Sequence, residues 1–263
     1  MLIHAILCAA SVVATAVVCA VCPALSAWWI PLLLIGAYAV GVAAQLTVLF
    51  IYSCFMRQAM PSAARRRFYR FISATAEWVV LLGGTRVFVR GTEKLPVDRP
   101  FLLVCNHRSA FDPLTTAAAL KNHDLAWVSK PENFRIPLIG AIMRRASYLP
   151  IDRENPRKAV TTIKQAAQYI SERALNIGIY PEGTRNKESE ELLDFHNGSF
   201  KIATTAKCPV AVLALRYEKG RFPYRLHAYI EVAEILDADY IAGHRTDTIS
   251  ERARAIIEQA LTK

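Results

Sequence analysis

A histidine and an aspartate five residues apart form the first group of polar side chains that could do chemistry. His107 and Asp112 belong to the segment Asn106-His107-Arg108-Ser109-Ala110-Phe111-Asp112, which directly follows the apolar run 101–105. A carboxylate bonded to one imidazole nitrogen fixes the tautomer, so the other nitrogen can take a proton from an alcohol. The spacing therefore suggests a general base. It is also compatible with Asp112 as the cap of a helix beginning at Pro113, and with His107 as an ordinary loop histidine.

A second polar segment, Tyr180-Pro181-Glu182-Gly183-Thr184-Arg185, follows another strand-like run. It brings an acid, a glycine, a hydroxyl and a guanidinium together within four residues. Gly183 permits close approach of the backbone, and Arg185 can bind a phosphate through two parallel hydrogen bonds. Taken alone, the segment could equally be a polar turn that contains a Glu-Arg pair.

Together the two segments resemble the glycerolipid acyltransferase family, typified by the 1-acylglycerol-3-phosphate acyltransferases. The family motif NHx4D matches Asn106, His107 and Asp112, and the PEGTR block matches residues 181–185. Further family-like blocks occur in the same order at residues 130–140, 148–153 and 195–203, so the resemblance runs from about Val87 to Leu215. Several ordered blocks are much less expected by chance than any single one.

Three positions depart from the family pattern. Tyr180 stands where the family often has Phe, and Asn197 stands where a Lys is common. The last block, Cys208 to Leu213, lacks the second proline of the family. We expect these differences to leave the reaction intact and to affect the shape of the acyl or acceptor pocket.

The resemblance implies transfer of a fatty acyl group from a thioester, acyl-CoA or acyl carrier protein, to the free hydroxyl of lysophosphatidic acid. His107 would be the general base and Asp112 would orient it, with no covalent acyl-enzyme. Backbone amides near Gly183 would face the developing oxyanion. The alternative acceptors are another lysophospholipid or glycerol 3-phosphate. Neither a metal nor a cofactor is expected beyond the thioester co-substrate.

Both substrates carry phosphate, and the resemblance assigns cations to bind it. Lys130 and Arg185 would hold the acceptor phosphate, and Arg153 is a further candidate that could instead form an ion pair with a neighbouring acid. Glu182 would orient Arg185 or bind the glycerol. The expected substrate-binding set is Lys130, Arg153, Glu182, Gly183, Thr184 and Arg185.

Between residues 85 and 263, short apolar runs alternate with helical stretches, which is typical of an α/β domain. We expect strands near residues 86–90, 101–105, 125–128, 148–151, 175–180, 210–215 and 224–232. Helices are expected near residues 113–120, 137–145, 156–173 and 247–261. The predicted fold is a central mixed sheet flanked by helices, with both polar segments at carboxyl ends of strands, where sites in such sheets gather.

The first 56 residues contain no Lys, Arg, Asp or Glu. Leu2 to Val21 and Trp28 to Ile51 each approach the roughly 20 apolar residues of a spanning helix, so we expect two transmembrane helices within 1–56. A cleaved signal peptide fits less well, because no basic residue precedes the apolar run. Arginines follow from Arg57 onward, so the hairpin would have both ends in the cytoplasm. The catalytic domain, residues 85–263, would then lie on the cytoplasmic side of the cell membrane.

The segment 57–84 has helical periodicity, with Pro61 near its start and Gly83 after its end. Four arginines crowd its first turns. We assign it as a basic amphipathic interfacial helix, and packing of its apolar face on the domain core is the alternative. The formal net charge of +10 suits an anionic membrane or an anionic substrate. Nucleic acid is not expected as a partner, because the sequence contains no recognised nucleic-acid motif.

Three other interpretations compete with acyl transfer. A lipid hydrolase could use Ser109 or Cys105 as nucleophile, although a G-x-S-x-G elbow is missing. A non-catalytic lipid-binding membrane protein could keep the family's shape, but it would need neither His107 nor Asp112. A metal site of His107, Asp112 and His123 has suitable residue types without a usual ligand spacing.

Overall fold

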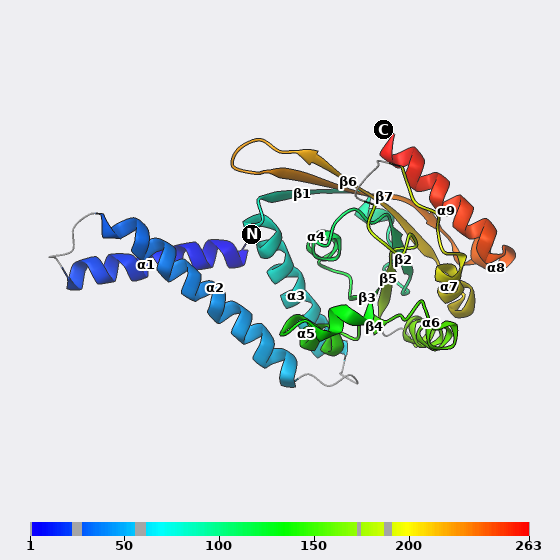
Figure 1. Cartoon of the computed structure of the whole chain (residues 1–263), viewed down its shortest axis with the longest axis horizontal. Coiled ribbons are helices and arrows are strands. Elements are labelled where there is room, and N and C mark those ends of the chain that lie inside the picture. Colours follow the sequence, from blue (N-terminus) through cyan, green and yellow to red (C-terminus); the bar gives the residue numbers. More distant parts are fainter. Residues whose placement is uncertain (1, 23–27, 56–61, 173–174, 187–190, 263) are drawn as a thin grey trace. The chain divides into compact units, whose positions relative to one another are not determined.

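The computed structural model describes residues 2–22, 28–55, 62–172, 175–186 and 191–262 (Figure 1). The chain divides into two compact units, Met1–Arg57 and Gln58–Lys263. The division falls beside the boundary expected at residue 56, where the uncharged part of the sequence ends.

The first unit consists of two helices that contact each other, α1 (Leu2–Val21) and α2 (Trp29–Phe55). Their packing is close at Gly41, where a Cβ would lie 2.9 Å from Cδ2 of Leu7. Many large apolar side chains stay exposed on both helices, among them Val12, Val13, Val17, Trp29, Leu32, Ile35 and Val40. Within the described residues, Trp29–Val48 alone is long and apolar enough to cross a membrane, and the apolar stretch Ile6–Val21 is shorter. Two spans therefore stay a prediction.

The second unit is built on a seven-stranded sheet in the order β1-β7-β6-β2-β5-β3-β4. β6 and β7 pair antiparallel and every other neighbouring pair is parallel. This arrangement confirms the predicted mixed α/β fold. The strands are β1 (Thr85–Arg90), β2 (Leu102–Cys105), β3 (Leu125–Ser129), β4 (Leu149–Pro150), β5 (Asn176–Ile179), β6 (Val210–Lys219) and β7 (Leu226–Leu236).

Helices cover both faces of this sheet (Figure 1). α3 (Ser62–Leu82) packs with α4 (Asp112–Ala119) on one face, and α6 (Pro156–Ser171), α7 (Lys201–Ala206) and α9 (Thr246–Leu261) lie on the other. The shorter elements are α5 (Ile139–Arg145), α8 (Ala238–Gly243), η1 (Thr92–Lys94), η2 (Pro131–Arg135) and η3 (Asn197–Phe200). The core on the α4 face combines strand residues such as Leu103, Trp127 and Leu213, all at most 2% exposed.

α3 packs its apolar face on the domain, which was the alternative to an interfacial position. Phe68, Trp78 and Val80 are at most 1% exposed, so this face is not available to lipid. The arginine-rich start of α3 also lies far from the active-site loops along the strands. Nε of Arg65 is 3.8 Å from Oδ2 of Asp124, the residue immediately before β3. Within the expected segment 57–84 the helix covers Ser62–Leu82 and packs its apolar face on the domain. An interfacial position of its basic face stays a prediction.

Candidate active site

The sequence-predicted site residues come from loops at one edge of the sheet. β2, β5, β3 and β4 are neighbours in this order and run parallel, so their carboxyl ends lie side by side. His107 follows β2, Glu182 follows β5, Lys130 follows β3 and Arg153 follows β4. The topology therefore gathers residues that are up to 78 positions apart in the sequence. This edge is where ligands bind in open α/β sheets.

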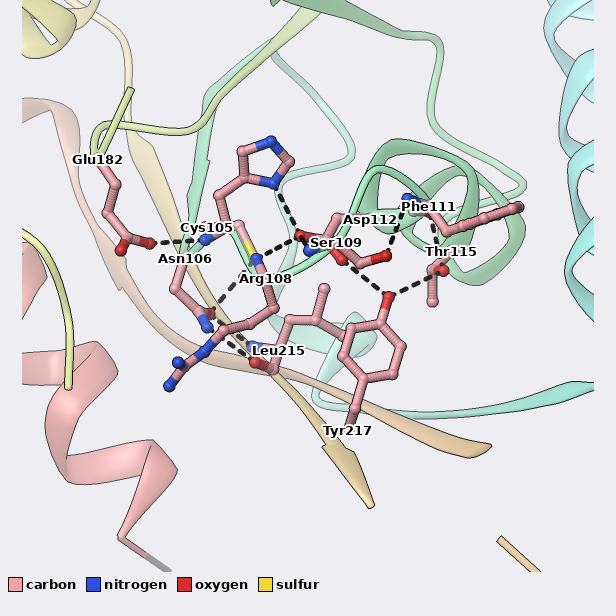
Figure 2. Close-up of polar contacts among 11 residues, drawn as sticks. Cys105, Asn106, Arg108, Ser109, Phe111, Asp112, Thr115, Glu182, Leu215 and Tyr217 are labelled. Atoms are coloured by element: carbon pink, nitrogen blue, oxygen red, sulfur yellow. Dashed lines mark hydrogen bonds and ion pairs between the residues drawn. The ribbon is translucent and has the colours of Figure 1, made fainter. Parts of the chain in front are cut away.

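His107 and Asp112 form a direct pair in the loop between β2 and α4. Nδ1 of His107 lies 2.8 Å from Oδ2 of Asp112. The same oxygen accepts the backbone N–H groups of Arg108 at 2.6 Å and Ser109 at 2.8 Å (Figure 2). The Asp112 side chain is fully buried and the His107 side chain is 18% exposed. The carboxylate is therefore fixed inside its own loop, and the imidazole keeps an accessible edge.

Asp112 does not act as the helix cap that its position before Pro113 allowed. Its bonded amides belong to the preceding turn, and α4 has Phe111 at its N-cap position without a side-chain cap bond. A bonded carboxylate of this kind holds the loop in a shape that presents His107.

Tyr217 is a second partner of Asp112 that the sequence reasoning missed. The Tyr217 hydroxyl donates to Oδ1 of Asp112 at 2.8 Å, and it lies 3.3 Å from Oγ1 of Thr115 (Figure 2). Burial raises the pKa of Tyr217, and the Asp112 charge acts in the same direction, so the phenol stays a donor. Tyr217 lies on β6, 105 positions after Asp112 in the sequence. In the sequence, the apolar run 210–215 was the only indication of this strand.

Asn106, the first residue of the NHx4D motif, connects two strands. Its Nδ2 donates to the Leu215 carbonyl, and its Oδ1 accepts from the Leu215 backbone N–H, both at 2.8 Å (Figure 2). The side-chain amide thus continues the β2–β6 ladder beyond Cys105, the last residue of β2. A buried amide that bonds both backbone groups of one residue fixes where the loop leaves the sheet.

The imidazole lies on an aromatic stack. The ring of His107 stacks on Tyr180 with centroids 4.1 Å apart, and Tyr180 stacks on Trp127 at 4.6 Å. Gly178 makes room for the indole, because a Cβ there would lie 2.7 Å from the Trp127 ring. One face of His107 is therefore covered, and the aromatic residue that replaces the family's usual Phe forms the cover.

Glu182 bonds to backbone amides, and among the described residues the structure shows no ion pair between it and Arg185. Oε1 accepts the His107 backbone N–H at 2.6 Å, and Oε2 accepts the Leu193 backbone N–H at 3.1 Å. The side chain is buried, at 4% exposure. Burial raises the pKa of Glu182, and the two amide donors act in the opposite direction. Glu182 thus joins the loop after β5 to the backbone that carries His107.

Gly183 has a left-handed backbone with φ of +73°. A Cβ there would lie 2.5 Å from Nη1 of Arg153 and 2.7 Å from Nε2 of His196, so this turn requires glycine for both conformation and space. The backbone N–H of Gly183 donates to the Tyr180 carbonyl at 3.0 Å. This bond occupies the Gly183 N–H, and the expectation that backbone amides near Gly183 face an oxyanion stays a prediction.

The remaining predicted binding residues are exposed cations and a hydroxyl. Lys130, Thr184 and Arg185 are all exposed at the ends of β3 and β5. Arg153 lies against Gly183, and burial lowers the pKa of its guanidinium. Asp152 and Glu154 were the acids expected as alternative partners of Arg153, and Oδ2 of Asp152 lies 3.7 Å from Nζ of Lys158. His196 adds a basic side chain at the same turn, and its only sequence signal was the family-like block 195–203.

The geometry gives little support to the competing sites. Cys105 is fully buried, and burial raises the pKa of its thiol well above the usual value, so it is a poor nucleophile. Oγ of Ser109 accepts the Phe111 backbone N–H at 3.2 Å. His123 precedes β3, at the edge opposite His107, so the three proposed metal ligands do not converge. Within the described residues, no three His, Cys, Asp or Glu side chains are grouped as a metal site.

Fold and site together define an acyltransferase domain, and comparison with known proteins agrees. The family model described as Acyltransferase matches residues 86–216, from β1 through most of β6. The chain belongs to the glycerolipid acyltransferase family, as its NHx4D and PEGTR segments predict.

Curated relatives carry the same family name. The chain is 27% identical over 200 residues to a chloroplast 1-acyl-sn-glycerol-3-phosphate acyltransferase of Brassica napus, covering 75% of this chain and 57% of that one. It is 29% identical over 147 residues to the 1-acyl-sn-glycerol-3-phosphate acyltransferase of Bacillus subtilis, covering 56% and 70%. The chain thus spans little more than half the length of the Brassica protein.

A solved structure supports the fold. The crystal structure of the 1-acyl-sn-glycerophosphate acyltransferase PlsC from Thermotoga maritima matches with a TM-score of 0.65 and 20% identity. The match covers 82% of this chain and 86% of the Thermotoga chain.

Proposed function

We propose that this protein transfers a fatty acyl group from an acyl thioester to the free hydroxyl of lysophosphatidic acid, giving phosphatidic acid. The observation that carries the proposal is the His107–Asp112 pair, in which a buried carboxylate with three further donors holds one imidazole nitrogen. The names of the Brassica and Bacillus relatives, both 1-acyl-sn-glycerol-3-phosphate acyltransferases, support the acceptor.

In the proposed reaction the acceptor hydroxyl attacks the thioester carbonyl carbon directly. Nε2 of His107 takes the hydroxyl proton while the new C–O bond forms. The C–S bond then breaks, and the proton passes from the imidazolium to the departing thiolate, so the thiol of coenzyme A or carrier protein is released. Asp112 stabilises the imidazolium between these steps. Positioned acid–base catalysis of this kind contributes about 10²–10⁴-fold.

The acceptor phosphate is assigned to the exposed cations beside this pair. Arg185 is exposed on the turn after β5, which Glu182 connects to the His107 backbone. Arg153 and His196 lie against Gly183 of the same turn. Lys130 lies at the end of β3, next to β5 in the sheet, and would take the outer side of the phosphate. Guanidinium groups suit this ligand because they bond phosphate oxygens in pairs.

We propose that the N-terminal helices anchor the enzyme in the cell membrane, with the α/β domain on the cytoplasmic side. The uncharged helices with exposed apolar side chains favour a bilayer, and the arginines after residue 56 favour the cytoplasmic side. Such an anchor would keep the site beside an acceptor that is itself a lipid, while the soluble donor arrives from the cytoplasm.

The test uses the full chain reconstituted in vesicles with labelled acyl thioesters. Lysophosphatidic acid, lysophosphatidylcholine and glycerol 3-phosphate are compared as acceptors, with acyl-CoA and acyl carrier protein as donors. We expect the fastest transfer to lysophosphatidic acid, and transfer about 10²–10⁴-fold slower in His107→Ala. Turnover of another acceptor alone would replace the proposed substrate. An acyl-enzyme detected by mass spectrometry and lost in Ser109→Ala would contradict the direct mechanism.

A further inference from the structure

The β6–β7 hairpin extends past β2 at the edge of the sheet that holds His107 (Figure 1). The start of β1 lies beside its tip, where the Gly84 carbonyl accepts the backbone N–H groups of Arg225 and Leu226. β6 pairs with β2 only as far as Leu213, and from Ala214 to Lys219 it continues with β7 alone. The turn beyond is closed by backbone hydrogen bonds, Gly220 N–H to the Arg225 carbonyl and Tyr224 N–H to the Arg221 carbonyl, both 2.9 Å. The hairpin tip is therefore an ordered turn held by its own backbone hydrogen bonds.

The tip combines cations with an exposed aromatic side chain. Residues 219–226 read Lys-Gly-Arg-Phe-Pro-Tyr-Arg-Leu, which contains three cations and no acid. Lys219, Arg221 and Arg225 are exposed, and Phe222 is 95% exposed. The nearest acid, Glu218, pairs with Arg216 at 2.9 Å, so it does not offset these charges. We call Lys219, Arg221, Phe222 and Arg225 the tip cluster.

A cavity of about 580 Å³ joins the tip cluster to the catalytic loop. Lys219 and Arg225 line it on one side, and Ser109 and Phe111, which lie between His107 and Asp112, line it on another. Phe111 is 50% exposed, and Leu226 beside the tip is 41% exposed. Apolar side chains thus surround an opening near the catalytic pair, with the tip cations beside them.

We propose that the tip cluster docks on an anionic bilayer, with Phe222 inserted at the headgroup level and the three cations bound to lipid phosphates. An aromatic side chain ringed by Lys and Arg is the pattern of an interfacial anchor. The arginine-rich start of α3 cannot serve this edge, because Arg65 contacts Asp124 at the opposite end of β3. The inference goes beyond the proposed reaction, since it concerns which face of the domain meets the lipid.

The test is insertion of a tryptophan at the tip of the full chain. Phe222→Trp is reconstituted in vesicles of phosphatidylcholine and phosphatidylglycerol that contain brominated lipid, and wild type gives the background of the four native tryptophans. Val97→Trp is the matched control, because Val97 is also 95% exposed but lies before β2, at the opposite edge. We expect clear additional quenching in Phe222→Trp and none in Val97→Trp.

Charge variants in the Phe222→Trp background test the role of the cations. Each Lys or Arg near an anionic surface contributes about fivefold to binding, so Lys219→Gln, Arg221→Gln and Arg225→Gln together should lower the docked-to-undocked ratio roughly 100-fold. Arg66→Gln, Arg67→Gln and Arg70→Gln, at the exposed start of α3, form the matched control and should leave the quenching unchanged. In vesicles of phosphatidylcholine alone, Phe222→Trp with its tip cations unchanged should show only weak quenching.

Three results would overturn the proposal. The first is quenching of Phe222→Trp that does not exceed that of Val97→Trp. The second is a loss of quenching in the α3 triple variant with none in the tip variant. The third is a spectral change of Phe222→Trp on addition of acyl carrier protein but not of vesicles, which would make the tip a docking site for an acidic protein. None of these readouts requires acyl transfer, so they are independent of the proposed reaction.

Discussion

The two polar loops of the candidate site each contain one acid but use it in different ways. In the loop after β2, Asp112 bonds to the side chain of His107, the proposed general base. In the loop after β5, Glu182 bonds only to backbone amides and so holds the scaffold, while Arg185 of the same loop points its charge to solvent. A motif acid therefore acquires its role from what its oxygens accept, which the sequence does not state.

The largest expected effect comes from removing the His107 side chain in the loop after β2. His107→Ala should lower kcat about 10²–10⁴-fold and leave acceptor binding nearly unchanged, because only the proton acceptor is lost. Steady-state kinetics on vesicles and lysolipid binding by the inactive variant measure the two quantities. Residual turnover within threefold of wild type would exclude His107 as the general base.

Substitution of Glu182 in the loop after β5 should lower the stability of the protein more than its activity. Glu182→Ala leaves two partly buried amides without acceptors, which costs roughly 2–6 kcal/mol at about 1–3 kcal/mol each. Thermal unfolding of the reconstituted protein measures the loss. Glu182→Gln keeps one acceptor oxygen and serves as the intermediate variant. Unchanged stability of the alanine variant would show that the two bonds contribute little.

Substitution of Arg185, the exposed cation in the loop after β5, should weaken binding of the acceptor. Arg185→Gln should raise the acceptor KM about 10–100-fold with a smaller change in kcat, because a charged hydrogen bond contributes about 1.5–3 kcal/mol. Lys121→Gln is a control cation whose partner is Glu77 on α3, away from the site. An equal KM increase in both variants would mean that the effect is general electrostatics.

The smallest expected effect comes from removing the hydrogen bond between Tyr217 and Asp112. Tyr217→Phe removes one neutral donor from Asp112 and should lower kcat about two- to tenfold. Asp112 keeps its two backbone donors, so its contact with His107 is loosened rather than broken and the acceptor KM should stay nearly unchanged. Steady-state kinetics on vesicles measure kcat and KM, and Tyr229→Phe is the control on β7. A kcat equal to that of Tyr229→Phe would show that the Tyr217 bond does not help to orient Asp112.

Local patterns predicted much of the fold, because its strands and helices are marked by apolar periodicity. The helix expected at 156–173 is α6, Pro156–Ser171, and the closing helix at 247–261 is α9, Thr246–Leu261. The strand expected from Tyr224 begins at Leu226, because the two preceding residues complete the hairpin turn. Strand order was beyond reach, since the pairing of β1 with β7 depends on contacts 141 residues apart.

The site was predicted as far as its motifs extend. His107 and Asp112 could be paired from their spacing, because they are five positions apart in one loop. Their contact does not depend on how distant parts of the chain are arranged. Tyr217 could not, since its hydroxyl reaches Asp112 only through the twist and register of β6. The Glu182 bonds to His107 and Leu193 likewise depend on which loop lies beside which, and backbone amides leave no signature in a sequence.

The aromatic stack beneath His107 restricts how an alcohol can arrive. Tyr180 covers one face of the ring, and Asp112 occupies the Nδ1 edge. A hydroxyl must therefore come edge-on, in the plane of the imidazole and towards Nε2. In the proposed reaction the acceptor would then be selected by how its hydroxyl lies relative to a flat ring rather than by the width of a pocket.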